Sequence, residues 1–315
     1  MSVRARKYLL AVEIALSFWP LAAHSRVWHV RNDGTGDAPT IQAAIDSSAA
    51  GDTITLAKGI FAEQSIMRCN LKNSLVINSE AGPGGTRIVP DTAASFLSIT
   101  ACSIIAIDGI SFMDFPGRAL YFWGSSQITI ANCNFLNNGH YYAKAAIFFE
   151  WCNGIDIHGC ILSGNKTGIY YGEMDSNIFN YNLTFLENTA CAINLLDVRD
   201  FRIDNSIISG SPYGIIGYGI NINVLCNNIF NNGENYAIMD FPDPTGLDGN
   251  ISVDPQFCSI DPVAYNNYFL QGDSPCAPGN HPSGYPCGLI GCKPVGCASV
   301  GIEKTDWSKV KQLFK

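Results

Sequence analysis

The sequence has little charge, a deficit of basic residues and few long apolar runs. Only 15% of its 315 residues are charged, and 19 Lys and Arg stand against 27 Asp and Glu, which gives a formal net charge of −8. Such a chain offers no basic surface to the phosphates of nucleic acid or of an anionic membrane. Beyond residue 25 no apolar run is long enough to span a bilayer. We therefore expect no nucleic-acid partner and no membrane-spanning segment, while the 47% apolar content excludes a disordered chain.

The first 25 residues have the pattern of a secretory signal peptide. A basic start (Arg4, Arg6 and Lys7) precedes an apolar run over residues 8–18 and a small-residue pattern at 23–25. The alternative is a buried N-terminal helix. Removal of residues 1–25 takes away three basic residues and one acidic residue, which moves the formal net charge from −8 to −10. The predicted location is secreted, extracellular or at the cell surface, with the periplasm included.

From Phe112 onward the sequence repeats in steps of 23, 27, 23, 23 and 22 residues. The anchor residues of the repeats are Phe112, Phe135, Leu162, Phe185, Ile208 and Phe230. Two apolar residues lie five and seven positions before each anchor, and two more lie thirteen and fifteen positions before it. A Gly or Asn lies three positions before each anchor. The alternation predicts three short strands per repeat, whose inward faces enclose one apolar core. Gly and Asn accept a left-handed backbone at low cost, so they mark a repeated tight corner. A repeat of this length predicts a solenoid.

The repeat fails at both ends, as the exposed ends of a solenoid core require. Residues 27–30 read as a strand, and residues 40–45 read as an amphipathic helix that would cover the open end and block edge pairing. The predicted organisation is a signal peptide over 1–25, one β-helix domain over 26–297 and a C-terminal tail over 298–315. Within the domain we expect an N-terminal cap over 26–56, regular rungs over about 70–245 and a Cys-rich closing segment over 250–297.

Twelve cysteines in a chain of this location suggest disulfides, but their positions separate them into two groups. Cys133 and Cys160 occupy the same slot of adjacent rungs, where they either bridge or remain as small buried apolar groups. A turn-rich stretch near the C-terminus holds Cys258, Cys276, Cys287, Cys292 and Cys297. We expect these five to staple an irregular end, with one left over or paired upstream. Their spacing lacks the short paired intervals of a zinc ribbon.

The sequence resembles the right-handed parallel β-helix proteins of the pectin-lyase-like superfamily, especially secreted bacterial members. The resemblance rests on residues 33–37 with 40–45, on rung motifs such as 130–135, and on 254–257 with 274–276, and it covers roughly residues 27–297. It implies an all-β fold, a single-stranded right-handed parallel β-helix with three short strands per rung and an N-terminal capping helix. It also implies a polysaccharide or cell-surface glycan as partner, and we expect a monomer. A repeat of this kind is specific for fold and weakly specific for activity.

An aromatic and acidic stripe is expected on the outer face of the first strand of successive rungs. Counting from the anchors places Tyr121 with Trp123, Phe148 with Glu150, and Tyr171 with Glu173 on this face, followed by Tyr218. The one lengthened rung carries His140, Tyr142 and Lys144 just before this strand, where an insertion would build a cleft wall. Flat rings beside acids suit stacking and hydrogen bonding to sugars. The alternative is that a loop covers the stripe, since exposed rings in a row are costly.

Three carboxylates are the candidate catalytic residues: Glu150, Glu173 and Asp175. Carboxylates on adjacent rungs would separate in pKa into an acid and a base, which is the arrangement of glycoside cleavage. The family motifs argue against this, because the Gly-His-Gly turn of polygalacturonase-like members is represented only by Ile157-His158-Gly159. The Arg and aspartates of pectate-lyase-like members and the Asp-Pro-His-Glu signature of alginate epimerases have no counterpart, so no family catalytic residue is carried across. No cofactor is predicted; acidic grooves can recruit calcium, but three carboxylates supply too few oxygens to predict a site.

Two functions therefore remain open from the sequence. The first is a secreted or cell-surface protein that recognises polysaccharide along the stripe, with lyase, hydrolase or epimerase activity as an extension. The second is a non-catalytic structural or adhesin-like solenoid, in which the stripe is packed or contacts another protein. Exposure of the outer face of the first sheet distinguishes the two.

Overall fold

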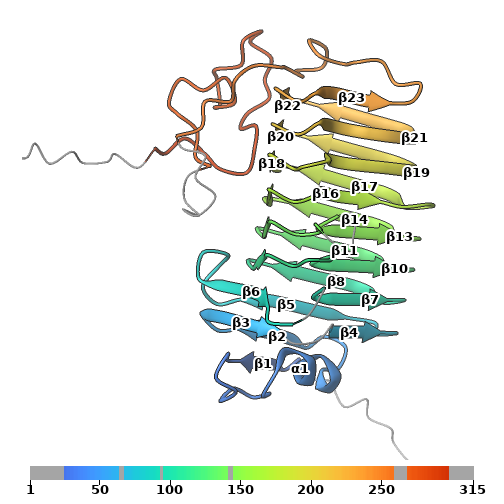
Figure 1. Cartoon of the computed structure of the whole chain (residues 1–315), viewed down its shortest axis with the longest axis vertical. Coiled ribbons are helices and arrows are strands. Elements are labelled where there is room, and N and C mark those ends of the chain that lie inside the picture. The colour runs from blue at the N-terminus through green and yellow to red at the C-terminus, as the bar shows by residue number, and fades with distance from the viewer. Residues whose placement is uncertain (1–24, 64–66, 93–94, 141–144, 259–267, 298–315) are drawn as a thin grey trace, which may run out of the picture.

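The computed structural model describes residues 25–63, 67–92, 95–140, 145–258 and 268–297, and it is a parallel β-helix with a short helix at its N-terminal end (Figure 1). The fold predicted from the repeat is confirmed. The expected signal peptide and C-terminal tail lie outside these residues, apart from residue 25. Within them, no helix is long and apolar enough to cross a bilayer.

The strands stack in three parallel columns, one strand of each per rung (Figure 1). The first column consists of β4 (Met67–Asn70), β7 (Leu97–Thr100), β10 (Leu120–Trp123), β13 (Ile147–Glu150), β16 (Thr167–Tyr171), the first parts of β19 (Cys191–Asp204) and β21 (Tyr213–Leu225), and β23 (Glu234–Ile238). The second consists of β1 (Val27–Val30), β2 (Thr53–Leu56), β5 (Leu75–Ser79), β8 (Ser103–Asp108), β11 (Ser126–Ala131), β14 (Asn153–His158), β17 (Ser176–Tyr181) and the later parts of β19 and β21. The third consists of β3 (Gly59–Glu63), β6 (Thr86–Pro90), β9 (Ser111–Met113), β12 (Asn134–Leu136), β15 (Ile161–Ser163), β18 (Thr184–Leu186), β20 (Ile207–Ser209) and β22 (Asn228–Phe230).

Identical slots of neighbouring rungs stack their side chains inside the solenoid. The rings of Phe112 and Phe135 lie 5.0 Å apart between centroids, and those of Phe122 and Phe149 lie 4.9 Å apart, both pairs being nearly parallel. These distances are close to the spacing of hydrogen-bonded strands. All four rings are fully buried, so the interior is one continuous apolar core that holds the outer faces rigidly in place.

Buried side chains also form hydrogen-bonded ladders at the corners. Asn138, Asn165 and Asn188 are fully buried, and the side-chain oxygen of each accepts a bond from the backbone N–H one rung earlier, Asn138 N to Asn165 Oδ1 being 2.9 Å. The corner between the first and second columns uses the same device, with Ser125 Oγ accepting from Cys102 N at 3.1 Å. These ladders satisfy backbone donors that no strand partner can reach.

The capping helix α1 (Ile41–Ser47) closes the N-terminal end as the sequence predicted. Its N-cap Thr40 accepts a bond from Ala43 N, and Ile41 and Ile45 are buried against the core. Gln42 pairs with the outer edge of β4: Arg68 N donates to its Oε1 at 2.8 Å, and its Nε2 donates to Arg68 O at 3.0 Å. One amide side chain thus replaces a neighbouring strand at this edge.

The Cys-rich C-terminal segment packs along the outside of the third column (Figure 1, orange to red). Its Leu270 and Ile290 bury Ile207, while Tyr268 covers Leu136 and Leu186. The disulfides are Cys226–Cys287 and Cys258–Cys297, whereas Cys276 and Cys292 are thiols. Cys287 is therefore paired upstream.

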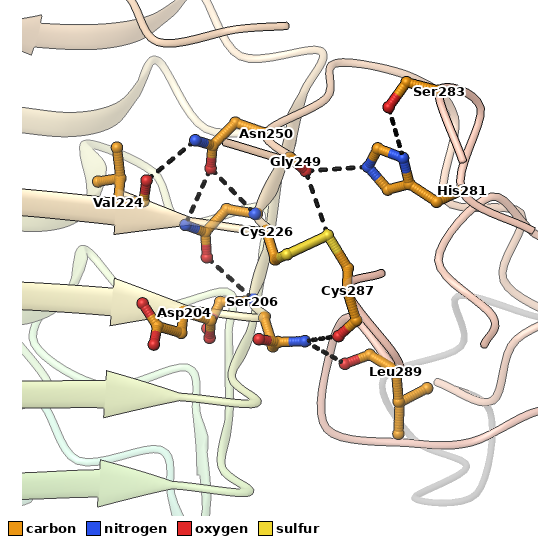
Figure 2. Close-up of a disulfide and its surroundings, with 12 residues drawn as sticks. Asp204, Ser206, Val224, Cys226, Gly249, Asn250, His281, Ser283, Cys287 and Leu289 are labelled. Atoms are coloured by element: carbon orange, nitrogen blue, oxygen red, sulfur yellow. Dashed lines mark hydrogen bonds between the residues drawn. A yellow bond between two sulfur atoms is a disulfide. The ribbon is translucent and has the colours of Figure 1, made fainter. Parts of the chain in front are cut away.

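Figure 2 shows how the first of these disulfides is surrounded. The bond joins Cys226, at a left-handed corner of the solenoid, to Cys287. Nearby, His281 Nε2 donates to Gly249 O, and His281 Nδ1 is hydrogen-bonded to Ser283 Oγ. Asn205 Nδ2 donates to Leu289 O at 3.0 Å. One disulfide and several polar contacts therefore attach the segment to this end of the solenoid, whereas Cys258–Cys297 closes a loop within the segment.

One anchor assigned by counting is corrected by the strand register, and one open question about cysteines is answered. Ile229 pairs with Ile208 and is fully buried, so Ile229 and not Phe230 is the last anchor. Cys133 and Cys160 remain thiols, and Cys160 Sγ accepts a bond from Cys133 N at 3.4 Å. Of the two readings of this pair, the structure has the unbridged one.

Candidate functional site

The outer face of the first column presents a short column of aromatic rings. Tyr121, Phe148 and Tyr170 occupy equivalent outward slots of β10, β13 and β16, and each is half-buried. The rings of Tyr121 and Phe148 meet edge to face at 5.8 Å, and those of Phe148 and Tyr170 stack at 4.4 Å. The predicted aromatic stripe is present, with one member exchanged.

Tyr171, expected on this face, lies inside the core instead. It pairs with Phe149, has no exposed surface, and stacks on Phe149 at 5.3 Å between centroids. Its hydroxyl donates to Asn180 Oδ1 at 2.7 Å, and burial raises the pKa of the Tyr171 hydroxyl well above its usual value. The outward position belongs to Tyr170, so the expectation for Tyr171 was wrong.

The rings of the aromatic column are largely occupied by the protein itself. The Arg118 guanidinium lies 4.3 Å from the centroid of Phe148 and 4.7 Å from that of Tyr121. Because Tyr170 stacks in parallel on Phe148 at almost the same distance, the guanidinium and the Tyr170 ring must cover opposite faces of Phe148. Phe148 therefore supports the surface and has no free face for a flat ligand.

A hollow flanks the aromatic column at each end. Toward the N-terminus a hollow of about 280 Å³ is lined by Arg68, Ser98, Arg118 and Tyr121, among others. Among the described residues neither arginine forms an ion pair with a carboxylate, and Arg118 Nε is buried without a hydrogen-bond partner. This is a cationic patch in a protein of negative net charge.

Toward the C-terminus a larger hollow of about 410 Å³ opens beyond Tyr170. Its lining includes Lys166, Tyr170, Asn194 and Tyr213. The two hollows and the rings between them form one elongated surface across β4 to β21, which spans about 30 Å at the usual spacing of strands. The surface has the shape of a track for an extended ligand.

Two tryptophans stand exposed along the edge of this track. Trp123 ends β10 and is 44% exposed, and Trp151 follows β13 and is 53% exposed. Because Trp123 pairs with Glu150 in the register, the two indoles belong to neighbouring rungs. Among the described residues neither indole contacts another aromatic ring. They are therefore the flat apolar surfaces that remain available for stacking.

Trp151 was missed in the sequence because it lies at a corner outside the alternating pattern. Its backbone is left-handed, with φ of 59°, as are Gly124 in the rung before and Met174 in the rung after. Bulky residues rarely occupy this conformation, which suits Gly, Asn and Asp. The signal that could have found it is the presence of Trp where a tight corner requires a small or polar residue.

The three predicted catalytic carboxylates differ in exposure, and Asp175 is removed from solvent. Asp175 has no exposed surface, and its oxygens accept bonds from Cys152 N at 2.7 Å and Gly172 N at 2.8 Å, so it is a rung of the corner ladder. Burial raises the pKa of Asp175 to about 7, and the charge of Glu150 adds to this rise. Glu150 is half-buried and accepts a bond from Tyr121 Oη at 2.9 Å, while Glu173 is exposed at the edge of the track.

Two of the remaining predicted residues, His140 and Tyr218, are exposed. His140 is exposed, and its Nε2 lies 3.0 Å from Gly164 O. Tyr218 is 39% exposed on β21. Tyr142 and Lys144 lie outside the described residues. Burial, followed by its bond to Glu150, raises the pKa of Tyr121 to about 12, so its hydroxyl stays protonated and donates a hydrogen bond at neutral pH.

Metal-ligating side chains are dispersed in the part of the chain that the structure covers. No three His, Cys, Asp or Glu residues gather there in a way that would hold a metal ion. His29 lies beside Glu80, His158 beside Asp156, and His281 beside Gly249, each on a different element. With both Asp175 oxygens engaged by backbone N–H groups, the carboxylates of the track provide no calcium cage.

Comparison with known proteins gives one family and a group of structural neighbours. Residues 98–277 match the family model described as periplasmic copper-binding protein (NosD). The crystal structure of pectate lyase Pel9A is 11% identical with a TM-score of 0.47, covering 86% of this chain and 97% of that chain. The PL6 family alginate lyase AlyGC is 13% identical with a TM-score of 0.33, covering 73% and 40%. No curated protein sequence matches significantly.

Proposed function

The chain belongs to the NosD family of periplasmic copper-binding proteins, and we propose that this member recognises a polysaccharide along the outer face of its first column. The family location agrees with the extracytoplasmic location predicted from the sequence. The observation that carries the proposal is the pair of exposed indoles, Trp123 and Trp151, on the edge of a track about 30 Å long. Indole faces stack on the apolar faces of sugar rings, and neighbouring rungs repeat the platform.

The track also has polar groups suited to hydroxyl-rich ligands. Glu150 accepts from Tyr121 and retains further acceptor capacity, while Lys166 and Asn194 line the larger hollow. A sugar polymer requires this mixture of flat apolar surface and directed hydrogen bonds.

The cationic hollow at the N-terminal end supports a glycan that carries acidic groups. Arg68 and Arg118 line it together, and guanidinium groups bind carboxylates and sulfates with two parallel hydrogen bonds. The hollow at the other end is lined by one cationic side chain, Lys166, so the preference for acidic groups should be strongest at the N-terminal end. We expect an acidic oligosaccharide to bind more tightly than a neutral one of the same length.

Recognition without cleavage fits the carboxylates better than hydrolysis. Glycoside cleavage by two carboxylates requires both to reach the scissile bond. Asp175 is fully buried in the corner ladder, and Glu150 is engaged by Tyr121. Burial of Asp175 removes one of the three predicted carboxylates from the ligand, while Glu150 and Glu173 remain as hydrogen-bonding groups at the surface.

Copper is implied by the family, but the described residues do not fit a copper centre. Copper sites combine His nitrogens with Cys or Met sulfurs around one point. Here the described histidines lie on separate elements with partners of their own, and no cluster of three ligands forms. No part of the proposed recognition depends on copper.

The proposal is tested by titrating the protein with neutral and acidic oligosaccharides and measuring affinity by calorimetry. Trp123→Ala and Trp151→Ala should each weaken binding roughly fivefold, corresponding to about 1 kcal/mol of lost stacking. Arg68→Gln should reduce the preference for acidic over neutral ligands. Ile220→Ala is the matched control, because Ile220 is 57% exposed on the later part of β21, away from the track. Absence of binding to every glycan by the unaltered protein would refute the proposal.

A further inference from the structure

Two cysteines meet at the N-terminal end of the solenoid without being bonded in the structure. Cys69 lies in β4 and Cys102 directly after β7, on neighbouring rungs, and their sulfur atoms are 3.3 Å apart. Both side chains are buried, with at most 2% of their surface exposed. We propose that Cys69 and Cys102 form a third disulfide, which clamps the first rung and its capping helix to the second rung.

The slot of Cys102 favours this role over a purely structural one. In the corner ladder between the first and second columns, the residues equivalent to Cys102 accept a hydrogen bond from a backbone N–H of the rung before. Ser125 and Asp175 accept this bond with a side-chain oxygen, at 3.1 and 2.7 Å. Cys102 Sγ accepts from Lys72 N at 3.4 Å, and sulfur is a weaker acceptor than oxygen. At Cys102 a second sulfur lies 3.3 Å away, and only a sulfur in this slot could form a covalent bond with it.

Cys152 provides the contrast within the same ladder. It occupies the equivalent slot two rungs further on, and its Sγ lies 3.4 Å from Glu150 O. Among the described residues no second sulfur contacts it, whereas Cys69 lies against Cys102. The pairing is thus a property of the first two rungs and not of the ladder in general.

The pair lies where the solenoid is weakest. β4 is the first strand of its column, and among the described residues the Gln42 amide takes the place of a neighbouring strand at its outer edge. Lys72, three residues after Cys69, donates from Nζ to Ser48 O at 2.6 Å and so contacts the end of α1. A solenoid opens from its ends, because terminal repeats have one neighbour. The bond would fasten the N-terminal end as Cys226–Cys287 fastens the other (Figure 2).

The chemistry needs a disulfide oxidant, either a low-molecular-weight disulfide or a thiol oxidoreductase. The Cys102 thiolate attacks one sulfur of the oxidant, forms a mixed disulfide and releases the first thiolate. Cys69 loses its proton, attacks the Cys102 sulfur and releases the second thiolate, so two electrons pass from the protein to the oxidant. This thiol–disulfide exchange must take place before the N-terminal cap buries the two cysteines.

The bond is detected by mass spectrometry of protein secreted into an oxidising compartment, unfolded in a thiol-blocking reagent without reductant. Trypsin cuts after Arg68, Lys72, Arg87 and Arg118, so Cys69 and Cys102 leave on separate peptides unless they are bonded. We expect the cross-linked pair together with Cys226–Cys287, while the peptides with Cys133 and Cys160 carry the blocking group. Blocking of both Cys69 and Cys102 in a sample whose Cys226–Cys287 bond is intact would overturn the proposal.

A matched pair of variants separates the bond from the ladder. Cys102→Ser keeps an acceptor of the kind found at Ser125, and we expect its melting temperature to fall by about 5–10 °C in the oxidised protein and not to fall when both proteins are fully reduced. Cys152→Ser, in the same slot, should show no such dependence on oxidation. Equal effects of the two variants would contradict the clamp. The clamp would also be contradicted if the purified protein held one equivalent of copper and Cys102→Ser abolished this binding, because the thiols would then be metal ligands.

Discussion

Asp175 is a single buried carboxyl group that couples the corner of a rung to pH. It was expected in the track as a catalytic acid, and it is instead an acceptor for two backbone N–H groups. Its pKa rises from 3.8 to about 7, chiefly through burial. The folded protein therefore binds this proton more tightly than the unfolded protein does, and ionisation of Asp175 destabilises the fold.

We expect this group to reduce stability as the pH rises from about 4 to about 7. Between pH 5 and pH 8 its contribution to the free energy of unfolding should fall by roughly 2–3 kcal/mol. Asp175→Asn cannot ionise, so the difference between unaltered protein and variant should change by this amount, as measured by urea unfolding at the two pH values. A difference that stays constant with pH would show that Asp175 is already ionised at pH 5.

At the level of the element, the corner between the first and second columns combines strain with exposure. Successive rungs place Gly124, Trp151, Met174 and Asp197 there, all with left-handed backbone. Gly and Asp tolerate this conformation, whereas Trp151 adopts it at a cost and exposes half of its surface. Strain at an exposed aromatic residue fits a binding role better than a structural one.

Trp151→Asn should therefore stabilise the protein while weakening glycan binding. Asn accepts the left-handed backbone, and we expect a gain of about 0.5–1 kcal/mol in the free energy of unfolding. Binding should fall roughly fivefold through loss of the indole face. Ile104→Asn is the control: Ile104 has φ of 54°, is 54% exposed and lies on β8, in the second column. It should gain stability without loss of binding, and a stability loss in both variants would contradict the argument from strain.

The sequence predicted the columns and the core well because inward slots repeat with the rung. Leu120, Phe122, Ile147 and Phe149 were all assigned correctly from the period. Counting from the anchors failed in the next rung, which contains β16. The corner before β16 is one residue shorter than the equivalent corner of the following rung, and the corner after β16 is one residue longer. The two changes cancel in the repeat length, so the period conceals them. A shift of one residue exchanges the faces of a strand, which moved Tyr171 into the core.

The site was harder to predict than the fold because its members do not share one periodic slot. Trp123 ends a strand and was found from alternation, but Trp151 lies at a corner, and Arg118 precedes its strand. Asp175 is buried where its carboxylate accepts hydrogen bonds from two backbone N–H groups, those of Cys152 and Gly172. Periodicity identifies which face a strand residue occupies and carries no information on corner residues.

Over the whole molecule, stability is concentrated in the middle rungs and must be supplied separately at the ends. The central rungs have partners on both sides, whereas within the part of the chain that the structure describes β23 pairs with β21 alone and β4 with β7 alone. The C-terminal segment covers apolar residues of the third column, including Leu186 and Ile207, and Cys226–Cys287 attaches it. This attachment should protect the third column more than the first.

Replacement of both Cys226 and Cys287 by Ser tests that arrangement. Closing a loop over a sequence separation of 61 residues corresponds to about 4 kcal/mol in the chain-entropy model, so we expect a clear loss of stability. Hydrogen exchange should then quicken in β18, β20 and β22, where the segment contacts the solenoid, and stay slow in β10 and β13 of the first column. Glycan affinity should be unchanged, because the track lies on the first column. A uniform loss of protection across all three columns would mean that the disulfide stabilises the solenoid as one cooperative unit.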